Sequence, residues 1–569
     1  MTLTGEPTDP SVNEGGVSAP AAVTEADRRF EALVKARFDS VVERSPVLGT
    51  FLGLSQYDGK LSDGSRDAAL GDIEDGQRYL ADLEALSAGD LSPYFAFERE
   101  LALYATRRLL FDDDVHRVWE RRTAAADEIG DGIFLTFSRG TTPLEERLAA
   151  IASRLEAAPA HIEQQKSRLV QQPVRLWNEL ELESATTLPS LFGEVVAAAR
   201  NELSEGHSET ARLERASAEA STALEGYIAW IKDQLANSTD EFAMGGDLLD
   251  EAVRLRAFDD LDTDAILTTG EEQLAFNSDN RARVAREIDP SATVGEVVAR
   301  IKSDHPADFQ LALAGYRKAM GDARQFVRDN GIASLPEGEA LDVIETPEYM
   351  RAVLPFAAYY LPPKFGRTDG TMKGLYLVTP SVDGDERALR EHNYASVYNT
   401  SIHEAYPGHH QQLCNSIDHP SLVRVLLDAP EFVEGWAMYC EQMMREEGFD
   451  TEPSHIVMMY TDAIWRACRI ILDVKLQRGE IGIGEAIDFL VEKTGFERPN
   501  AAAEVHWYTY RPTYPMSYLL GKVLLLRLRE DEKRRLGDRF SLRAFHDTML
   551  REGSLPISFH RRVLAAAAA

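Results

Sequence analysis

Hydrophobic residues in the N-terminal half of the chain recur with the period of an α-helix. In the first clear run, apolar side chains return every three or four positions: Phe30, Leu33, Val34, Phe38, Val41 and Val42. Ser45-Pro46 ends this run. Ala- and Glu-rich stretches of the same kind, among them 143–157 and 211–235, continue to about residue 330. They contain few clustered histidines or cysteines, so we interpret residues 26–345 as a helical scaffold and cleft wall.

The pattern changes near Pro347. Residues 359–370 contain the prolines and glycines typical of a loop, and Gly374–Thr379 alternates as a short strand does. Residues 386–415 are predicted to form one helix. We therefore predict a second region over 346–569. Residues 1–25 are rich in Pro, Gly, Ser, Thr and acidic residues, which is typical of a disordered tail.

The segment His403-Glu404-Ala-Tyr-Pro-Gly-His409-His410 carries the most specific chemistry of the chain. Neutral imidazoles hold zinc, and a carboxylate beside them can act as a base. The common form of this motif is His-Glu-x-x-His on one helical turn, but here a proline stands four residues after His403. On an unbroken helix His410 would lie roughly 10 Å away, too far to share an ion. A bulge at the Pro-Gly pair would instead make His409 the second ligand, with His410 as a supporting residue or alternative ligand.

A catalytic zinc ion needs a third protein ligand, and the segment 431–441 contains carboxylates among apolar residues. Glu434 has apolar neighbours, where an unpaired carboxylate is costly and metal binding would remove that cost. Glu441 lies two turns further along the same face, where it is better suited to orient a ligand or substrate. We therefore predict one zinc ion per chain, held by His403, His409 and Glu434. The same ligands could take Mn, Co or Ni in vitro.

Three blocks of the chain resemble a known family. They read HEAYPGHHQQ (403–412), EGWAMYCE (434–441) and RPTYPMSYLLGK (511–522). They resemble the bacterial domain-of-unknown-function 885 family, over about Phe30 to Leu564. Its members in turn resemble gluzincin metallopeptidases of the thimet oligopeptidase and thermostable carboxypeptidase type. The resemblance implies a mainly α, two-lobed, zincin-like fold with a deep cleft, a zinc ion at its floor and a small β-sheet beside the metal helix.

Further candidate residues lie in the last part of the chain. Gluzincins stabilise the oxyanion with a Tyr or His from a late helix, which suggests Tyr518 first and Tyr514 second. Arg511 could bind a substrate carboxylate through two hydrogen bonds. The alternative is that these aromatic residues pack in the core with their hydroxyl groups satisfied. Arg469 and Asp473, four residues apart on a helix, are expected to form an ion pair.

The region before the metal motif has a candidate substrate-binding role. In zinc peptidases an edge strand beside the metal pairs with an extended substrate. The resemblance makes Gly374–Thr379, with Tyr376, the candidate for that strand, and a purely structural hairpin is the alternative. In the block 434–441, Tyr439 joins Glu441 as a candidate to support the metal ligands.

The composition of the chain restricts the binding partners and the cellular location that the sequence predicts. The chain has 569 residues, a net charge of -33 and a pI near 4.8, which argues against binding to nucleic acid or to anionic membranes. The first residues lack the basic and apolar segments of a signal peptide, and no apolar stretch reaches the roughly 18 residues of a membrane span. Cys414, Cys440 and Cys468 are expected to be ordinary buried thiols. From these features we expect a cytoplasmic protein.

The predicted function is hydrolysis of short peptides by a zinc-activated water molecule, with Glu404 as the general base. Two alternatives stay open. One is a zinc amidase that acts on a small acylated metabolite. The other is an inactive zincin-like scaffold or binding protein, against which the intact Glu404 argues, because a structural zinc site has no need of that base. The choice between exopeptidase and endopeptidase and the oligomeric state are left open.

Overall fold

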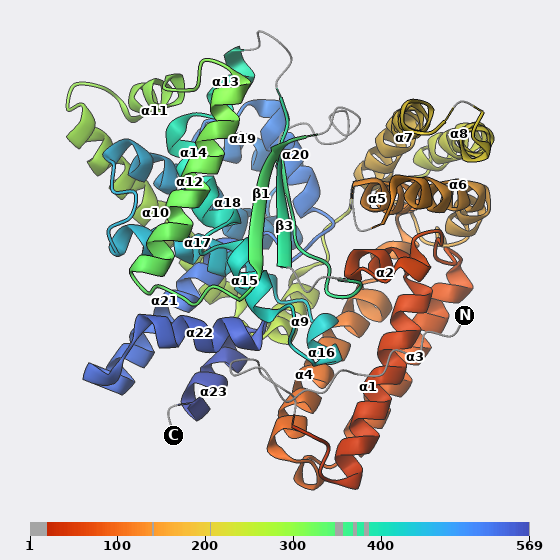
Figure 1. Cartoon of the computed structure of the whole chain (residues 1–569), viewed down its shortest axis with the longest axis horizontal. Coiled ribbons are helices and arrows are strands. Elements are labelled where there is room, and N and C mark those ends of the chain that lie inside the picture. The colour runs from red at the N-terminus through yellow and green to blue at the C-terminus, as the bar shows by residue number, and fades with distance from the viewer. Residues whose placement is uncertain are drawn as a thin grey trace.

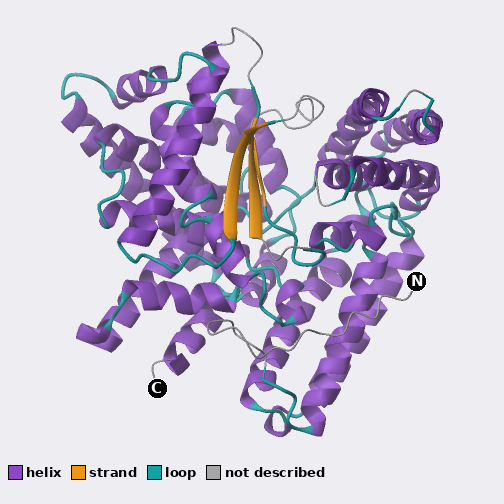
Figure 2. Cartoon of the chain, viewed as in Figure 1, coloured by secondary structure: helices purple, strands orange, loops and turns teal. Residues whose placement is uncertain are grey.

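The computed structural model describes residues 20–138, 142–204, 206–346, 357–367, 372–380 and 386–567. It is mainly helical and contains a small three-stranded sheet, as expected from the sequence (Figures 1 and 2). The N-terminal helices are α1 (Glu25–Arg44), α2 (Pro46–Leu52), α3 (Arg66–Ala85), α4 (Pro93–Leu110), α5 (Ala125–Ser138), α6 (Leu144–Lys166), α7 (Arg175–Glu202) and α8 (Ser208–Leu235).

Local sequence signals explain where the first helices begin and end. Helix α1 begins with a capping box, in which Thr24 and Asp27 each accept a hydrogen bond from the other's backbone N–H. It ends before Ser45, and Pro46 occupies the first position of α2, where its missing N–H costs nothing. The predicted helical runs at 30–42, 143–157 and 211–235 lie within α1, α6 and α8, apart from Pro143, which caps α6.

The rest of the chain adds further helices and the sheet. The middle helices are α9 (Gly246–Arg256), α10 (Thr263–Ile288), α11 (Val294–Ser303) and α12 (Phe309–Asp329). The C-terminal helices are α13 (Glu386–Glu391), α14 (Tyr394–Glu404), α15 (His409–Ser416), α16 (Leu422–Val425), α17 (Pro430–Glu446), α18 (Pro453–Gln477), α19 (Ile483–Thr494), α20 (Arg498–Tyr508), α21 (Ser517–Leu536), α22 (Leu542–Glu552) and α23 (Ile557–Ala567).

Separate hydrophobic cores hold these helices together. Helices α5 to α8 share one core, built from side chains such as Ile129, Phe137, Leu155, Phe192 and Tyr227. A larger core joins α9, α10, α12, the sheet, α14, α17, α18, α21, α22 and α23, and it includes Leu249, Leu313, Trp436, Leu520 and Leu564. In Figure 1, α1 to α8 lie on one side of the sheet and α10 to α14 on the other.

The sheet differs from the expectation. Its strands are β1 (Glu339–Glu345), β2 (Ala357–Tyr360) and β3 (Met372–Val378), in the order β1-β3-β2. β3 pairs in parallel with β1 and antiparallel with β2, so both of its edges are occupied. The prediction that Gly374–Thr379 is an edge strand is therefore wrong. A central strand has no free backbone groups for a substrate, because its N–H and C=O groups already bond to neighbours.

The helix expected over 386–415 is broken into α13, α14 and α15. The sheet and the larger core join residues on both sides of the expected boundary at 345/346. Residues 1–19 of the expected disordered tail lie outside the described residues. Among the helices of the described residues, none is both long and apolar enough to cross a membrane.

Candidate metal centre

The break between α14 and α15 brings the two predicted histidine ligands together. His403 lies in the last turn of α14 and His409 opens α15. Between them the peptide before Pro407 is cis, and the backbone N–H of Gly408 donates to the carbonyl oxygen of Ile402 at 3.1 Å. A Cβ atom on Gly408 would lie 1.9 Å from the carbonyl oxygen of His403, so this close approach requires glycine. The chain thus turns at the Pro-Gly pair, where the sequence predicted a bulge.

The imidazole rings of His403 and His409 are nearly perpendicular, with centroids 4.9 Å apart. Glu434, from α17, faces both: its Oε2 lies 3.9 Å from Nε2 of His403 and 3.5 Å from Nε2 of His409. One ligand atom from each of the three residues lies within 4.8 Å of the others. Among the described residues, no other group of three His, Cys, Asp or Glu side chains meets this criterion.

These distances fit a zinc ion. Zinc bonds of about 2.0–2.1 Å at tetrahedral angles place two ligand atoms about 3.3 Å apart, close to the separations from Glu434. The three side chains are 11%, 12% and 14% exposed, so solvent reaches them. Burial lowers the pKa of His409, but the carboxylates of Glu434 and Glu404 outweigh it and raise the value to about 9. Burial raises the pKa of Glu434, but His409 and His403 lower it to about 2.

Behind His403 stands a second carboxylate. Nδ1 of His403 lies 2.7 Å from Oε1 of Glu441, and Glu441 is buried. An ionised carboxylate can only accept, so Nδ1 donates and the Nε2 lone pair remains available on the side of Glu434. Asn399 donates to Glu441 at 3.2 Å and to Asp462 at 2.7 Å. Asn399 was not predicted from the sequence, although it stands four residues before His403 and so shares its helical face.

Glu404 and the two predicted tyrosines lie beside this group. Burial and the charge of Glu434 raise the pKa of Tyr518 to about 12, and Arg469 partly offsets them. Burial, followed by the charge of Glu434, also raises the pKa of Tyr514. The two phenol rings are 6.1 Å apart. Glu404, the last residue of α14, is partly exposed, and its charge adds to the raised pKa of His409.

A close contact between two glycines, one in α17 and one in α21, sets the positions of Glu434 and Tyr518. A Cβ atom on Gly435 would lie 2.6 Å from Cα of Gly521, and one on Gly521 would lie 1.9 Å from the carbonyl oxygen of Glu431. The two backbones can approach this closely only because neither position carries a side chain. Gly435 directly follows Glu434, and Gly521 lies one turn after Tyr518. The crossing therefore places the predicted third ligand and the predicted oxyanion donor near each other.

His410 faces away from the three-residue group. It is fully buried, with Nε2 3.0 Å from Oε2 of Glu339 in β1 and Nδ1 3.0 Å from the hydroxyl of Tyr359 in β2. The hydroxyl of Tyr406 donates to the same Glu339 oxygen at 2.7 Å. Gly374 in β3 leaves room for this imidazole, since a Cβ there would lie 2.5 Å from Nδ1. His410 thus ties the metal-motif segment to the sheet.

The remaining predicted site residues are Tyr439, Tyr376 and Arg511. The Tyr439 hydroxyl lies 2.8 Å from Nε2 of His546. Tyr376 is only 3% exposed, and its ring lies 5.5 Å from that of Tyr316. Burial, the Tyr316 phenol and then the charge of Glu404 raise the pKa of Tyr376 well above its usual range, which places it near Glu404. Arg511 is exposed.

The expected ion pair between Arg469 and Asp473 is wrong. Arg469 bonds to Glu504 at 2.9 Å, whereas Asp473 accepts backbone N–H bonds from Thr513 and Met516, each at 3.2 Å. A buried carboxylate gains more from two rigid backbone donors than from a neighbour already paired. The three cysteines are free and buried, as expected, and burial raises the pKa of each thiol: Cys414, Cys440 and Cys468.

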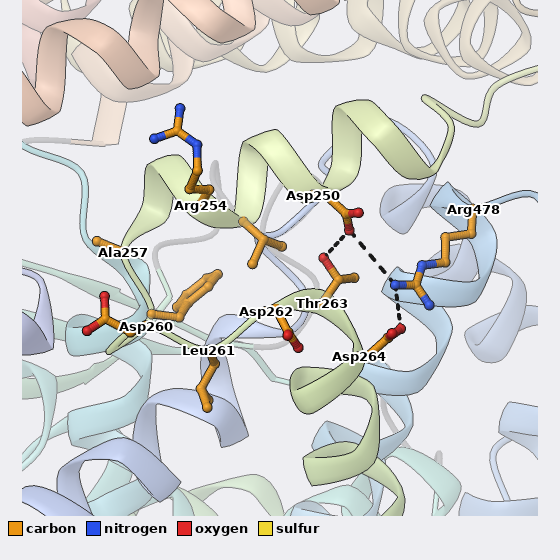
Figure 3. Close-up of a pocket in the computed structure, with 11 residues that line it drawn as sticks. Asp250, Arg254, Ala257, Asp260, Leu261, Asp262, Thr263, Asp264 and Arg478 are labelled. Atoms are coloured by element: carbon orange, nitrogen blue, oxygen red, sulfur yellow. Dashed lines mark hydrogen bonds and ion pairs between the residues drawn. The ribbon is translucent and has the colours of Figure 1, made fainter.

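A cavity of about 440 Å³ lies apart from the metal centre, at α9, α10 and the end of α18 (Figure 3). It contains none of the predicted site residues. In its wall Arg478 bonds to Asp264 at 2.8 Å, and Thr263 donates to Asp250 at 2.5 Å.

Among the solved structures that share this fold are two that are described as putative lipoproteins. A "putative lipoprotein of unknown function" from Shewanella oneidensis is 23% identical, with a TM-score of 0.76 over 94% of this chain and 99% of that one. A "putative lipoprotein" from Colwellia psychrerythraea is 19% identical, with a TM-score of 0.78 over 95% of this chain and 99% of that one. Among curated proteins, none matches the chain.

These neighbours contradict the expected cytoplasmic location. Lipoproteins are anchored to membranes outside the cytoplasm, so the location inferred from the first residues of the sequence is not kept. The pattern of those residues was its main support, and residues 1–19 lie outside the described part of the chain. The family resemblance, by contrast, is confirmed: the profile described as "Bacterial protein of unknown function (DUF885)" matches residues 46–564. The chain therefore belongs to the DUF885 family of bacterial proteins.

Proposed function

We propose that the chain is a zinc-dependent hydrolase that cleaves short peptides. The observation that supports it most is the convergence of His403, His409 and Glu434, whose ligand atoms lie within 4.8 Å of one another. Three protein ligands leave a fourth tetrahedral position for water or substrate, as in catalytic zinc sites. A two-lobed zincin-like fold, with the centre at the floor of a cleft, forms part of this proposal.

Hydrogen bonding orients one of the residues that would hold the ion. Glu441 fixes the His403 ring with Nε2 available, and this support is typical of metal-binding histidines. When bound, zinc would act as a Lewis acid toward water and the substrate carbonyl group. Because His403, His409 and Glu434 are partly exposed, water and the substrate carbonyl group can both reach the centre.

The remaining steps use side chains of this protein. Glu404 takes a proton from the attacking water and delivers it to the leaving amine. Tyr518, with Tyr514 as second candidate, donates a hydrogen bond to the oxyanion that develops on the carbonyl oxygen. The raised pKa of both phenols keeps their protons in place at neutral pH, so they remain donors.

Metal content and peptide hydrolysis test this function. Protein supplied with zinc and then dialysed should retain about one zinc per chain, measured by mass spectrometry. Glu434→Ala should lose it, whereas Glu446→Ala, on the same helix and paired with Arg529, should not. Wild type should cleave members of a short-peptide library, and Glu404→Gln should keep zinc but lose at least hundredfold in kcat. Absence of retained zinc in wild type, or full activity of Glu404→Gln, would refute the proposal.

A further inference from the structure

One face of α18 borders the candidate metal centre and carries a row of charged residues. Asp462, Arg466, Arg469 and Asp473 are spaced so that they follow one another along this face. Asp462 accepts a hydrogen bond from Asn399, which also donates to the Glu441 carboxylate behind His403. The Arg469 guanidinium lies 4.4 Å from the centroid of the Tyr518 ring. Arg466 lies between these two points of contact.

Aromatic stacking holds the Arg466 guanidinium in place. Its Cζ atom lies 3.6 Å from the centroid of a Trp465 ring, and the Cζ atom of Arg469 lies 4.5 Å from a ring of the same indole. Trp465 is fixed in turn, because its Nε1 donates to Glu504 at 3.1 Å. Two guanidinium groups are therefore held around one indole beside Tyr518.

The two arginines differ in how their donors are used. In Arg469, Nε and Nη2 bond to Glu504, and the buried Nη1 has no hydrogen-bond partner. In Arg466, both Nε and Nη1 are buried without a hydrogen-bond partner. The carboxylate paired with Arg466 is that of Asp462, whose Oδ1 lies 3.7 Å from Nη1, beyond hydrogen-bond distance. Arg466 thus carries a planar set of donors whose pairing is incomplete.

An anion can reach this group. The Arg466 side chain is 14% exposed, similar to the predicted metal ligands. Its charge also acts on the site, since it lowers the pKa of Tyr518 after the larger effects of burial, Glu434 and Arg469. Its third nitrogen, Nη2, is not among the buried atoms and makes no hydrogen bond among the described residues, so its N–H groups are available to a carboxylate oxygen. Arg511, the residue expected in this role from the sequence, is instead exposed and lies near Asp131, whose pKa burial raises and Arg511 partly lowers.

We propose that Arg466 binds the terminal carboxylate of the substrate through its Nη2 group, so that the site selects peptides with a free C-terminus. This inference rests on the proposed peptidase function, because it names the substrate class of that same site. It assigns cleavage to bonds near the C-terminal end of a short peptide. A blocked C-terminus removes the anion and leaves the Arg466 donors without their acceptor.

Binding measurements separate this inference from catalysis. The zinc-loaded Glu404→Gln protein is titrated with trialanine and with trialanine amide in a calorimeter. Trialanine should bind at least tenfold more tightly, as expected for charge-assisted hydrogen bonds. Adding Arg466→Gln should reduce this ratio to nearly one, and Arg466→Lys should keep only part of it, because lysine retains the charge but not the planar donors. Arg478→Gln, directly after the same helix and in the cavity of Figure 3, is the matched control and should keep the full ratio.

Equal affinity of the Glu404→Gln protein for the acid and the amide would overturn the inference, even if the Arg466 variants failed to fold. A preference for the acid that persists in folded Arg466→Gln would overturn it too. Neither result depends on turnover. If wild type cleaves no peptide, the proposed function fails, while the ratio of the two affinities still decides whether Arg466 binds a carboxylate.

Discussion

Nδ1 of His403 lies 2.7 Å from Oε1 of Glu441, although the two residues are 38 positions apart and belong to different helices. This contact joins α14 to α17 and turns the His403 ring so that Nε2 faces the side of Glu434. Asn399 extends the contact to Asp462 on α18. Residues from three helices therefore orient the His403 imidazole. A preorganised metal site requires rigid support of this kind.

Removal of the Glu441 charge should weaken zinc binding. Glu441→Gln keeps the size of the side chain but loses the ionised acceptor of the His403 proton. The dissociation constant for zinc, measured by competition with a chelator, should rise roughly 10–100-fold. Glu446→Gln, on the same helix, should leave it unchanged. An unaltered constant in Glu441→Gln would mean that the carboxylate does not support the metal.

Replacement of the two adjacent histidines should have opposite effects. His409→Ala should abolish retention of zinc with little loss of fold, because His409 is partly exposed at the centre. His410→Ala should retain zinc but lower stability, because it leaves Glu339 and Tyr359 without their buried partner. Metal analysis and thermal unfolding of both variants measure this difference. Loss of zinc in His410→Ala alone would reassign the ligand.

The crossing of α17 and α21 should not tolerate a methyl group. Gly521→Ala would place Cβ 1.9 Å from a backbone oxygen, so the helices must separate. We expect a loss of about 3 kcal/mol or more in the free energy of unfolding, together with weaker zinc binding. Gly226→Ala in α8, where a Cβ meets nothing within 4 Å, is the matched control and should be neutral or stabilising by up to about 1 kcal/mol. Urea unfolding of the two variants tests the contrast, and equal stability would contradict the close contact.

Glu431 should make stability depend on pH. Its carboxyl oxygens are buried without hydrogen-bond partners, and burial raises its pKa to about 7 from 4.5, while Arg256 partly offsets the rise. Between these pH values the folded state keeps a proton that the unfolded state has lost, so wild type loses stability as pH rises from about 4.5 to 7. Glu431→Gln removes this titration. Its gain over wild type should be about 2–3 kcal/mol larger at pH 7.5 than at pH 5 in urea unfolding. If the free energies of unfolding of Glu431→Gln and wild type differed by the same amount at both pH values, the titration of Glu431 would not affect stability.

The sequence by itself determined most of the helical regions and the identity of the three residues that converge at the candidate centre. Hydrophobic periodicity and helix stop signals act within a few positions, so the C-terminal ends of α1 and α8 could be predicted from the local pattern. The spacing from His403 to His409, with Glu434 downstream, was enough to select the three residues that converge. These signals are local, or they depend on the rare composition of one segment.

Only the tertiary structure decided how distant segments meet. β1 pairs with β3 across more than a dozen intervening residues, and this pairing made β3 a central strand where the sequence suggested an edge. The backbone turn at Gly408 decided that His409 faces Glu434 while His410 faces Glu339. Arg466 was not singled out at all. The use of a donor or an imidazole depends on which acceptor the rest of the fold brings within about 3 Å, and spacing along one helix does not contain that information.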